Sequence, residues 1–200
     1  LFSILLDGIK LNTSNATDEY KKAFPKGTPL VCACEKGRLE DVKLLVRGCN
    51  DVNGSNGNNN NMTLKDMVNQ VGNASSGFAW TPLMAAAYGE HFQLVQYLIE
   101  QGEADPNILR SDGWNALHWA AWNNETTTGL IQLLLTHMSL ASVNNKKNWA
   151  EYTPLDWAYD DNHSPIRQEI VALIRSKGGK ANCHDENGRN VGVGNGDLND

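Results

Sequence analysis

The stretch "WTPLMAAAYGEHFQLVQYLIEQGEADPN" at residues 80–107 decides the fold, because it contains two short helices and the signals that delimit them. Thr81 suits the N-cap of a first helix, and Pro82 then stands in its first turn, where a missing N–H costs nothing. The second helix carries apolar residues such as Leu94 and Leu98 at helical spacing. One such unit is too small to bury its own apolar face, so the stretch predicts stacking against similar units.

Three further segments of the chain repeat this pattern. They are "GTPLVCACEKGRLEDVKLLVRGCNDVN" (27–53), "WNALHWAAWNNETTTGLIQLLLTHMSLASVN" (114–144) and "YTPLDWAYDDNHSPIRQEIVALIRSKGGKAN" (152–182). The position of Thr81 is taken by Thr28, Asn115 and Thr153 in these segments, with successive separations of 53, 34 and 38 residues along the chain. The first separation equals one period plus about 20 residues, which indicates an insertion.

The repeating unit resembles the ankyrin repeat, whose signature is Thr-Pro-Leu-His-x-Ala at a period of about 33 residues. The resemblance covers about 130 residues, and it implies an all-α ankyrin-repeat solenoid of helix-turn-helix repeats with short hairpin loops. We expect about four full repeats plus partial repeats at both ends, either as a window on a longer array or as an array with degenerate caps. The chain departs from the signature where Asn115-Ala116 replaces Thr-Pro, and its His occurs only as His118.

The alignment also predicts domain boundaries. They are a degenerate partial repeat with an insertion (1–26), a first repeat (27–53), an Asn/Gly-rich insertion (54–78), three further repeats (79–110, 111–147 and 148–182) and a partial hairpin with a flexible tail (183–200). Within the long insertion, "MTLKDMVNQV" (62–71) predicts a short helix. Its Asn-rich flanks cannot bury enough surface to order themselves, so we expect the chain to fold with 54–78 replaced by a short connection.

The composition bears on the class of protein. The formal net charge of -6 argues against non-specific binding to nucleic acid, and no run of about 18 apolar residues is present to span a membrane. The four cysteines lack a second Cys/His pair at zinc-ligand spacing, which favours packed free thiols in a reducing compartment. We therefore expect a cytoplasmic or nuclear monomer without cofactor or metal.

Motifs for catalysis are absent from the sequence: it contains no nucleophile elbow, P-loop, zincin or EF-hand pattern. The resemblance implies structural roles for His118, within its repeat, and for His91, in the turn before a second helix. Asp160 and Asp161 have no third ligand nearby in sequence, so they predict a solvated helix end. The chain is predicted not to be an enzyme.

Three tryptophans crowd into "GWNALHWAAWNNE" (113–125), and the resemblance assigns them different surroundings. Trp119, like Trp157, takes a position that packs against the neighbouring repeat. Trp114 and Trp122 take positions that face the concave groove, so Trp119→Ala should unfold the array whereas Trp114→Ala and Trp122→Ala should fold normally. The two groove positions hold Gly27, Trp80 and Tyr152, and Glu35, Tyr88 and Asp160, in the other repeats.

These features predict a non-catalytic scaffold or adaptor that binds another protein in an aromatic, acid-rimmed concave groove. The predicted contacts are Trp80, Tyr88, Trp114, Trp122 and Tyr152, with an acidic rim of Glu35, Asp112, Glu151 and Asp160. Such a rim favours a basic partner segment over nucleic acid or a membrane. Three alternatives stay open: the rings stabilise the stack without a partner, the array is the targeting arm of a larger enzyme, or it is a structural spacer.

The resemblance also suggests one modification site. The stretch "LVRGCNDVN" places Asn53 eight residues after Leu45, which is similar to the sites of asparaginyl hydroxylation in ankyrin repeats. The alternative is that Asn53 closes its hairpin with its own backbone hydrogen bonds.

Overall fold

The computed structural model describes Asp18 and residues 28–51, 63–123, 125–146, 151–159, 165–185 and 187–191, with only the backbone of 48–51. The predictions for Asn53 and Asp160 lie outside the described residues. Helices dominate the described part, alongside one two-stranded ribbon and one isolated bridge, which confirms the predicted all-α fold. The contacts divide the chain into two units, Leu1–Asp105 and Pro106–Asp200.

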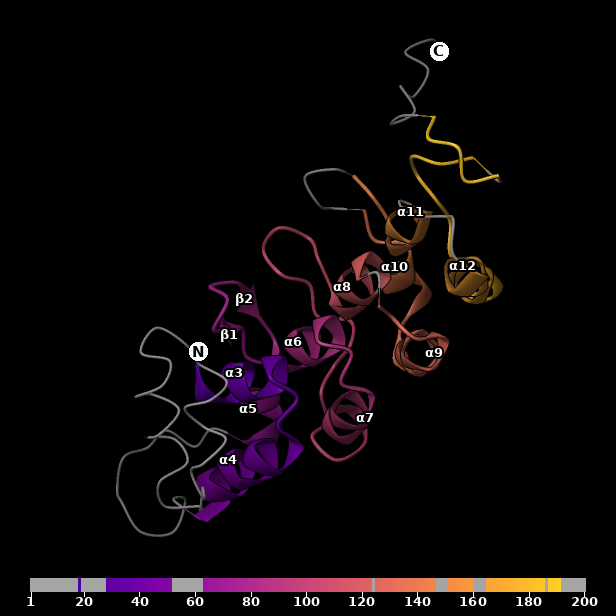
Figure 1. Cartoon of the computed structure of the whole chain (residues 1–200). Coiled ribbons are helices and arrows are strands. Elements are labelled where there is room, and N and C mark those ends of the chain that lie inside the picture. The colour runs from indigo at the N-terminus through magenta and orange to yellow at the C-terminus, as the bar shows by residue number, and fades with distance from the viewer. Residues whose placement is uncertain are drawn as a thin grey trace. The chain divides into compact units, whose positions relative to one another are not determined.

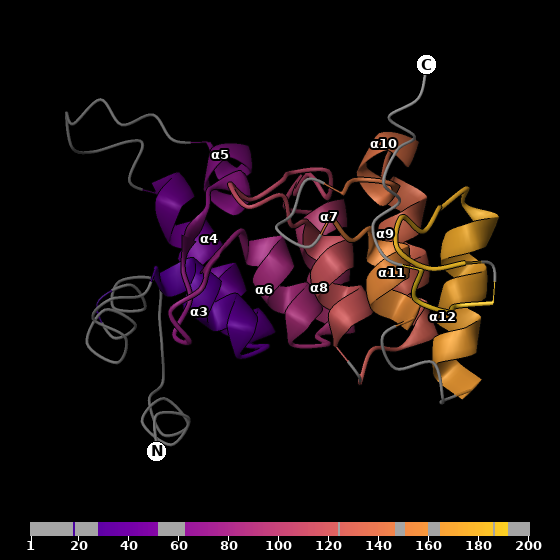
Figure 2. The ribbon, with the colours of Figure 1, turned by 90° about the horizontal axis from the view of Figure 1, so that it is seen from above.

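The first unit contains two helix-turn-helix pairs. Helix α3 (Pro29–Glu35) packs against α4 (Leu39–Asp51), and α6 (Pro82–Tyr88) packs against α7 (Phe92–Glu100). The first helices of the two pairs, α3 and α6, lie side by side (Figures 1 and 2). Thr81 caps α6 as predicted, since its hydroxyl oxygen accepts a hydrogen bond from the backbone N–H of the third helical residue at 3.2 Å.

The second half of the long insertion is folded into this unit. Helix α5 (Leu64–Asn69) confirms the helix predicted within 62–71, and Thr63 caps it in a capping box. Strand β1 (Gly72–Asn73) then pairs antiparallel with β2 (Ala79–Trp80). The hairpin reaches back to the first repeat, where Thr28 exchanges hydrogen bonds with the backbone of Asn73 at 2.8 and 3.1 Å.

The structure argues against the expectation that all of 54–78 is dispensable for folding. Val68 of α5 is fully buried, and α5 contacts both α4 and α6. A deletion of the whole segment would remove this helix, strand β1 and the hydrogen bonds to Thr28.

The second unit contains two more helix-turn-helix pairs and one short helix. The pairs are α8 (Ala116–Trp122) with α9 (Thr128–His137), and α11 (Pro154–Tyr159) with α12 (Pro165–Ser176); α10 (Leu140–Val143) lies between them in the chain. Helix α8 packs against α11, and α9 packs against α12 (Figure 2). Asn115 begins α8 in place of the usual Thr, because its side-chain oxygen accepts the N–H of His118 at 3.1 Å.

The small residues of the first helices are buried, as their role in close packing requires. Ala86, Ala87, Ala120 and Ala121 have no exposed surface. We expect Ala120→Leu to overpack the contact of α8 and to lower the free energy of unfolding by about 1–3 kcal/mol in urea denaturation. Ala141→Leu, on the exposed side of α10, is the matched control. An Ala120→Leu midpoint equal to that of the control would show that the helix contact is wrongly assigned.

Candidate functional site

The tryptophans of the second unit form one cluster with a buried part and an exposed tip. The ring centroid of Trp114 lies 4.5 Å from that of Trp119 and 4.9 Å from that of Trp157. All three of these side chains are buried, which confirms the core assignment of Trp119 and Trp157. Trp122 is 40% exposed and meets Trp114 and Trp119 edge-on, with centroid distances of 6.1 and 5.7 Å. The cluster therefore presents Trp122 to solvent and keeps the others inside.

Two predicted contact residues, Trp80 and Trp114, are corrected by their burial. Trp114 is only 6% exposed, and Trp80 of the first unit is fully buried. The ring centroids of Phe78 and Tyr88 each lie 5.1 Å from that of Trp80. The physical reason is that neighbouring rings lie against both side chains, and for Trp114 one of these rings, Trp157, comes from the next repeat. Both residues belong to the core and cannot be contacts as they stand.

The aromatic surface outside the core consists of other side chains. Tyr88 and Tyr152 are half-buried, and the hydroxyl oxygen of Tyr152 accepts a hydrogen bond from Asn190 Nδ2 at 3.0 Å. Phe78 is 42% exposed and stacks on Trp80. Phe78 was not predicted as a surface ring because it falls in the insertion. Its position two residues before Trp80 was a usable signal, since side chains two apart in an extended segment share a face.

Two of the three described acidic rim residues, Glu35 and Asp112, already accept hydrogen bonds from donors of this chain. Glu35 accepts hydrogen bonds from the backbone N–H groups of Ser75 and Ser76 at 2.9 and 3.3 Å, and from the Ser75 hydroxyl. Asp112 forms a two-point ion pair with Arg110. Burial would raise the pKa of the Asp112 carboxyl, but the Arg110 guanidinium, together with backbone N–H donors, lowers that pKa below its ordinary value. Among the described rim residues, Glu151 alone is exposed, whereas Glu35 and Asp112 are half-buried.

The backbone beneath Trp122 is held by two side chains from outside helix α8. The Thr126 hydroxyl donates to the carbonyl of Ala120 at 2.6 Å. The buried guanidinium of Arg167 donates to the carbonyls of Ala121 and Trp122, the latter at 3.3 Å. These bonds satisfy carbonyls that a helix end leaves without an intrahelical partner. No local sequence signal identifies Arg167, because 45 residues separate it from Trp122.

Both predicted structural histidines hold the repeat together. His118 is fully buried, with Nδ1 accepting the backbone N–H of Asn115 at 3.2 Å. Its Nε2 donates to the carbonyls of Asn145 and Tyr152, at 3.1 and 3.3 Å. His91 Nε2 lies 3.1 Å from a backbone carbonyl oxygen of the first repeat.

Because His118 is buried in the neutral form, we expect the free energy of unfolding to decrease in acid. Burial lowers its pKa from 6.5 to about 4, although the carbonyls of Tyr152 and Asn145 favour the charged form. As the pH falls below 6.5, the unfolded chain takes up a proton that the folded chain binds only near pH 4, so the folded state loses about 3 kcal/mol across that window. Urea denaturation at several pH values should show this loss in wild type and a smaller one in His118→Gln. Equal pH slopes for the two proteins would contradict it.

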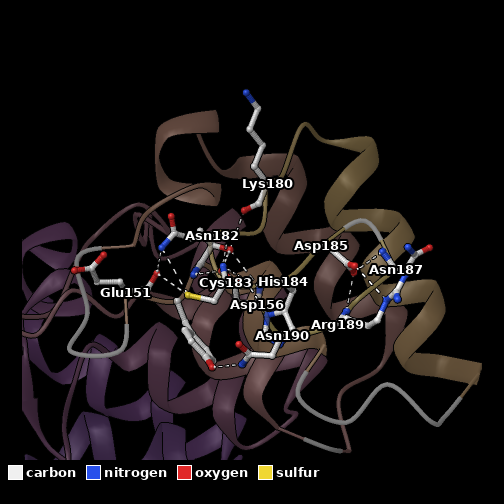
Figure 3. Close-up of polar contacts among 12 residues, drawn as sticks. Glu151, Asp156, Lys180, Asn182, Cys183, His184, Asp185, Asn187, Arg189 and Asn190 are labelled. Carbon is white, nitrogen blue, oxygen red and sulfur yellow. Dashed lines mark hydrogen bonds and ion pairs between the residues drawn. The ribbon is translucent and has the colours of Figure 1, made fainter. Parts of the chain in front are cut away.

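Asp156 is a second buried residue that binds several donors (Figure 3). It takes the position of the His in the Thr-Pro-Leu-His signature. One carboxylate oxygen accepts from the backbone and hydroxyl of Thr153 and from the N–H of Asn182, each at 2.8 Å. The other accepts from the N–H of Cys183 and from His184 Nδ1, both at 2.9 Å. Burial would raise the pKa of this carboxyl, but the donors from Asn182 and His184 hold it below its ordinary value.

These bonds anchor the hairpin that ends the described chain. His184 pairs with Asn190 in a bridge, and the N–H of Val191 donates to the carbonyl of Cys183 at 2.8 Å. The same hairpin supplies the Asn190 amide that binds Tyr152. Asp156 thus anchors the hairpin that carries Asn190, the hydrogen-bond partner of Tyr152.

The described residues include no group of three or more His, Cys, Asp or Glu side chains placed to hold a metal ion. Three cysteines, Cys32, Cys34 and Cys183, are free and buried, and burial raises the pKa of Cys32 to about 12. None of the described helices is long and apolar enough to cross a membrane.

Comparisons with known proteins agree with this architecture. A family model for "Ankyrin repeats (3 copies)" matches residues 55–137, and one for "Ankyrin repeat" matches residues 27–57. The protein "Ankyrin repeat and SAM domain-containing protein 6" of Rattus norvegicus is 31% identical over 154 residues, which cover 76% of this chain and 14% of that protein. Its counterpart in Mus musculus is 30% identical over 154 residues, with the same coverage. The chain thus spans only a small part of the length of these relatives. On the family models that match it, the chain belongs to the ankyrin repeat family.

Proposed function

We propose that this chain is a non-catalytic adaptor that binds another protein, and that its contact in the second unit centres on Trp122. Ankyrin repeats generally mediate protein–protein interactions. The observation that carries the proposal is the split of the tryptophan cluster, in which Trp122 is 40% exposed beside buried Trp114 and Trp119. Tryptophan is enriched among the residues that dominate binding energy.

The surroundings of Trp122 support a preorganised contact. Two rings brace it edge-on, and Arg167 and Thr126 hold the end of its helix. An anchor that is already fixed in the free protein loses less conformational entropy on binding. Tyr152, held through its hydroxyl by Asn190, adds a second ring in this unit, while Tyr88 and Phe78 play the equivalent role in the first unit.

The proposed partner is a protein segment that covers Trp122 and Tyr152 of the second unit. Glu151 remains open to a Lys or Arg of the partner, whereas Glu35 and Asp112 already bind donors of this chain. The buried free thiols support a reducing compartment, either cytoplasm or nucleus. A targeting arm of a larger enzyme would use the same contact surface. A purely structural spacer would not lose a partner when Trp122 is truncated.

The test is quantitative capture from an extract of the source cells, with the immobilised chain as bait. Proteins retained by wild type are identified, purified and titrated against wild type, Trp122→Ala and Phe92→Ala. Phe92 is also 40% exposed but lies on α7 of the first unit, so it controls for the loss of an exposed ring. We expect Trp122→Ala to weaken binding about 30-fold, equivalent to 2 kcal/mol, and Phe92→Ala to leave it unchanged. Equal affinities of all three proteins would refute the proposal.

A further inference from the structure

The aromatic cluster of the second unit already holds a cation. The guanidinium carbon of Arg110 lies 5.5 Å from the centroid of the Trp119 ring. Its Nε donates to Asp112 Oδ1 at 2.8 Å, and an Nη atom donates to the other carboxylate oxygen. A π face combined with a carboxylate is a site that attracts a positively charged side chain. Here the occupant comes from the same hairpin as the carboxylate.

The turn itself does not depend on this guanidinium. Backbone bonds close it, because the Arg110 N–H donates to the carbonyl of Trp114 at 2.8 Å and the Gly113 N–H donates to that of Arg110 at 2.9 Å. Gly113 supplies the left-handed residue, with φ of 87°. The two hydrogen bonds use only backbone atoms of Arg110, so its side chain can leave without opening the turn.

The last hairpin of the chain gives an internal comparison. It also pairs an Asp with an Arg, Asp185 with Arg189 at 3.2 Å, and the N–H of Asp185 donates to the carbonyl of Arg189 at 2.9 Å. The Arg189 side chain is nevertheless 76% exposed. A hairpin of this chain can therefore close with its arginine in solvent, so hairpin closure alone does not account for the position of Arg110 over a tryptophan.

The site is reachable from the exposed tip of the cluster. The ring of Trp119 that carries Arg110 meets Trp122 at a centroid distance of 5.7 Å. The side chains of Arg110 and Asp112 are 18% and 31% exposed, so solvent reaches both members of the ion pair. Trp119 thus contacts both Trp122 and Arg110. A partner that covers Trp122 would therefore bring its own adjacent side chains close to the ion pair of Arg110 and Asp112.

We propose that the Trp119 face and the Asp112 carboxylate form a cation-binding subsite, filled by Arg110 in the free protein and taken over by a Lys or Arg side chain of a bound partner. The occupancy by a partner rests on the proposed function, whereas the chemistry of the subsite does not. Arg110 then competes with the partner for the subsite. A partner without a basic side chain at this point gains no binding free energy from the subsite.

The test uses ethylguanidinium as a probe of the emptied site, followed by tryptophan fluorescence in the 200-residue chain. Arg110→Ala should give a saturable change with a dissociation constant on the order of 1 mM. Wild type should respond at least roughly tenfold more weakly, because its own guanidinium competes. Arg110→Gln, which keeps a hydrogen-bonding side chain without the charge, gives a second emptied site should Arg110→Ala fail to fold.

The controls isolate charge and position. N-ethylurea has a similar shape without the charge and should not bind. Arg189→Ala removes an arginine that pairs with Asp but sits in solvent, so it should create no site. Adding Asp112→Asn to Arg110→Ala should abolish the response.

Absence of a saturable response in both Arg110 variants, or equal binding of N-ethylurea, would overturn the subsite. If the probe binds but Trp122→Ala leaves partner capture intact, the subsite stands and its use by a partner at Trp122 is refuted. If a partner is captured and Arg110→Ala binds it about tenfold or more tightly than wild type does, the competition is supported.

Discussion

Trp114→Ala should lower the free energy of unfolding by about 3–5 kcal/mol, as a truncated core tryptophan does. Its side chain is buried, and its ring lies against those of Trp119 and Trp157 at 4.5 and 4.9 Å. The repeat pattern alone predicts that this variant folds normally, so the structure reverses that expectation. Trp119→Ala should cost a similar amount, as the sequence already predicts.

Urea denaturation followed by far-UV circular dichroism measures these losses. Phe92→Ala is the matched control, because it removes an aromatic ring that is 40% exposed. A Trp114→Ala midpoint close to that of Phe92→Ala would mean that the ring is outside the core, and it would restore the original groove assignment.

Asp156→Ala should be comparably destabilising, with a loss of about 3–5 kcal/mol. The substitution leaves the buried N–H of Cys183 and the part-buried N–H of Asn182 without their acceptor, and it removes the carboxylate that binds His184. Hydrogen exchange at these two amides should accelerate, since the hairpin loses its anchor.

The chain offers a matched control for this variant in helix α5. Thr63 and Asp66 form the same capping box as Thr153 and Asp156, but Asp66 is exposed, and among the described residues its hydrogen bonds stay within its own box. Asp66→Ala should therefore change stability far less than Asp156→Ala. Equal losses would show that the capping box, and not the anchoring of the hairpin, accounts for the effect of Asp156.

The helices could be predicted from the sequence because their signals are local. Thr81 with Pro82 begins one helix, and Asn115 begins another even where Thr-Pro is missing. The burial of Val68 was not predictable in the same way, because a short helix in an insertion carries no sign of what it packs against.

The candidate site was only partly predictable, for a related reason. A position in the repeat gives the direction of a side chain but not what covers it. Phe78 and Tyr88 lie against Trp80, and Trp157 is one of the rings that lie against Trp114. Trp80 and Trp114 are therefore buried in the core. The bonds from Arg167 to helix α8 span 45 residues or more, beyond any local pattern.

The central claim is that Trp122 is present for a partner and not for the fold, and the unfolding free energy of Trp122→Ala tests it most directly. Two edge-on ring contacts are lost, so we expect a decrease of about 1–2 kcal/mol, well below the loss for Trp114→Ala. This modest loss replaces the expectation of no effect. A decrease of about 3 kcal/mol or more, equal to that of Trp114→Ala, would place Trp122 in the core and contradict its role as a binding residue.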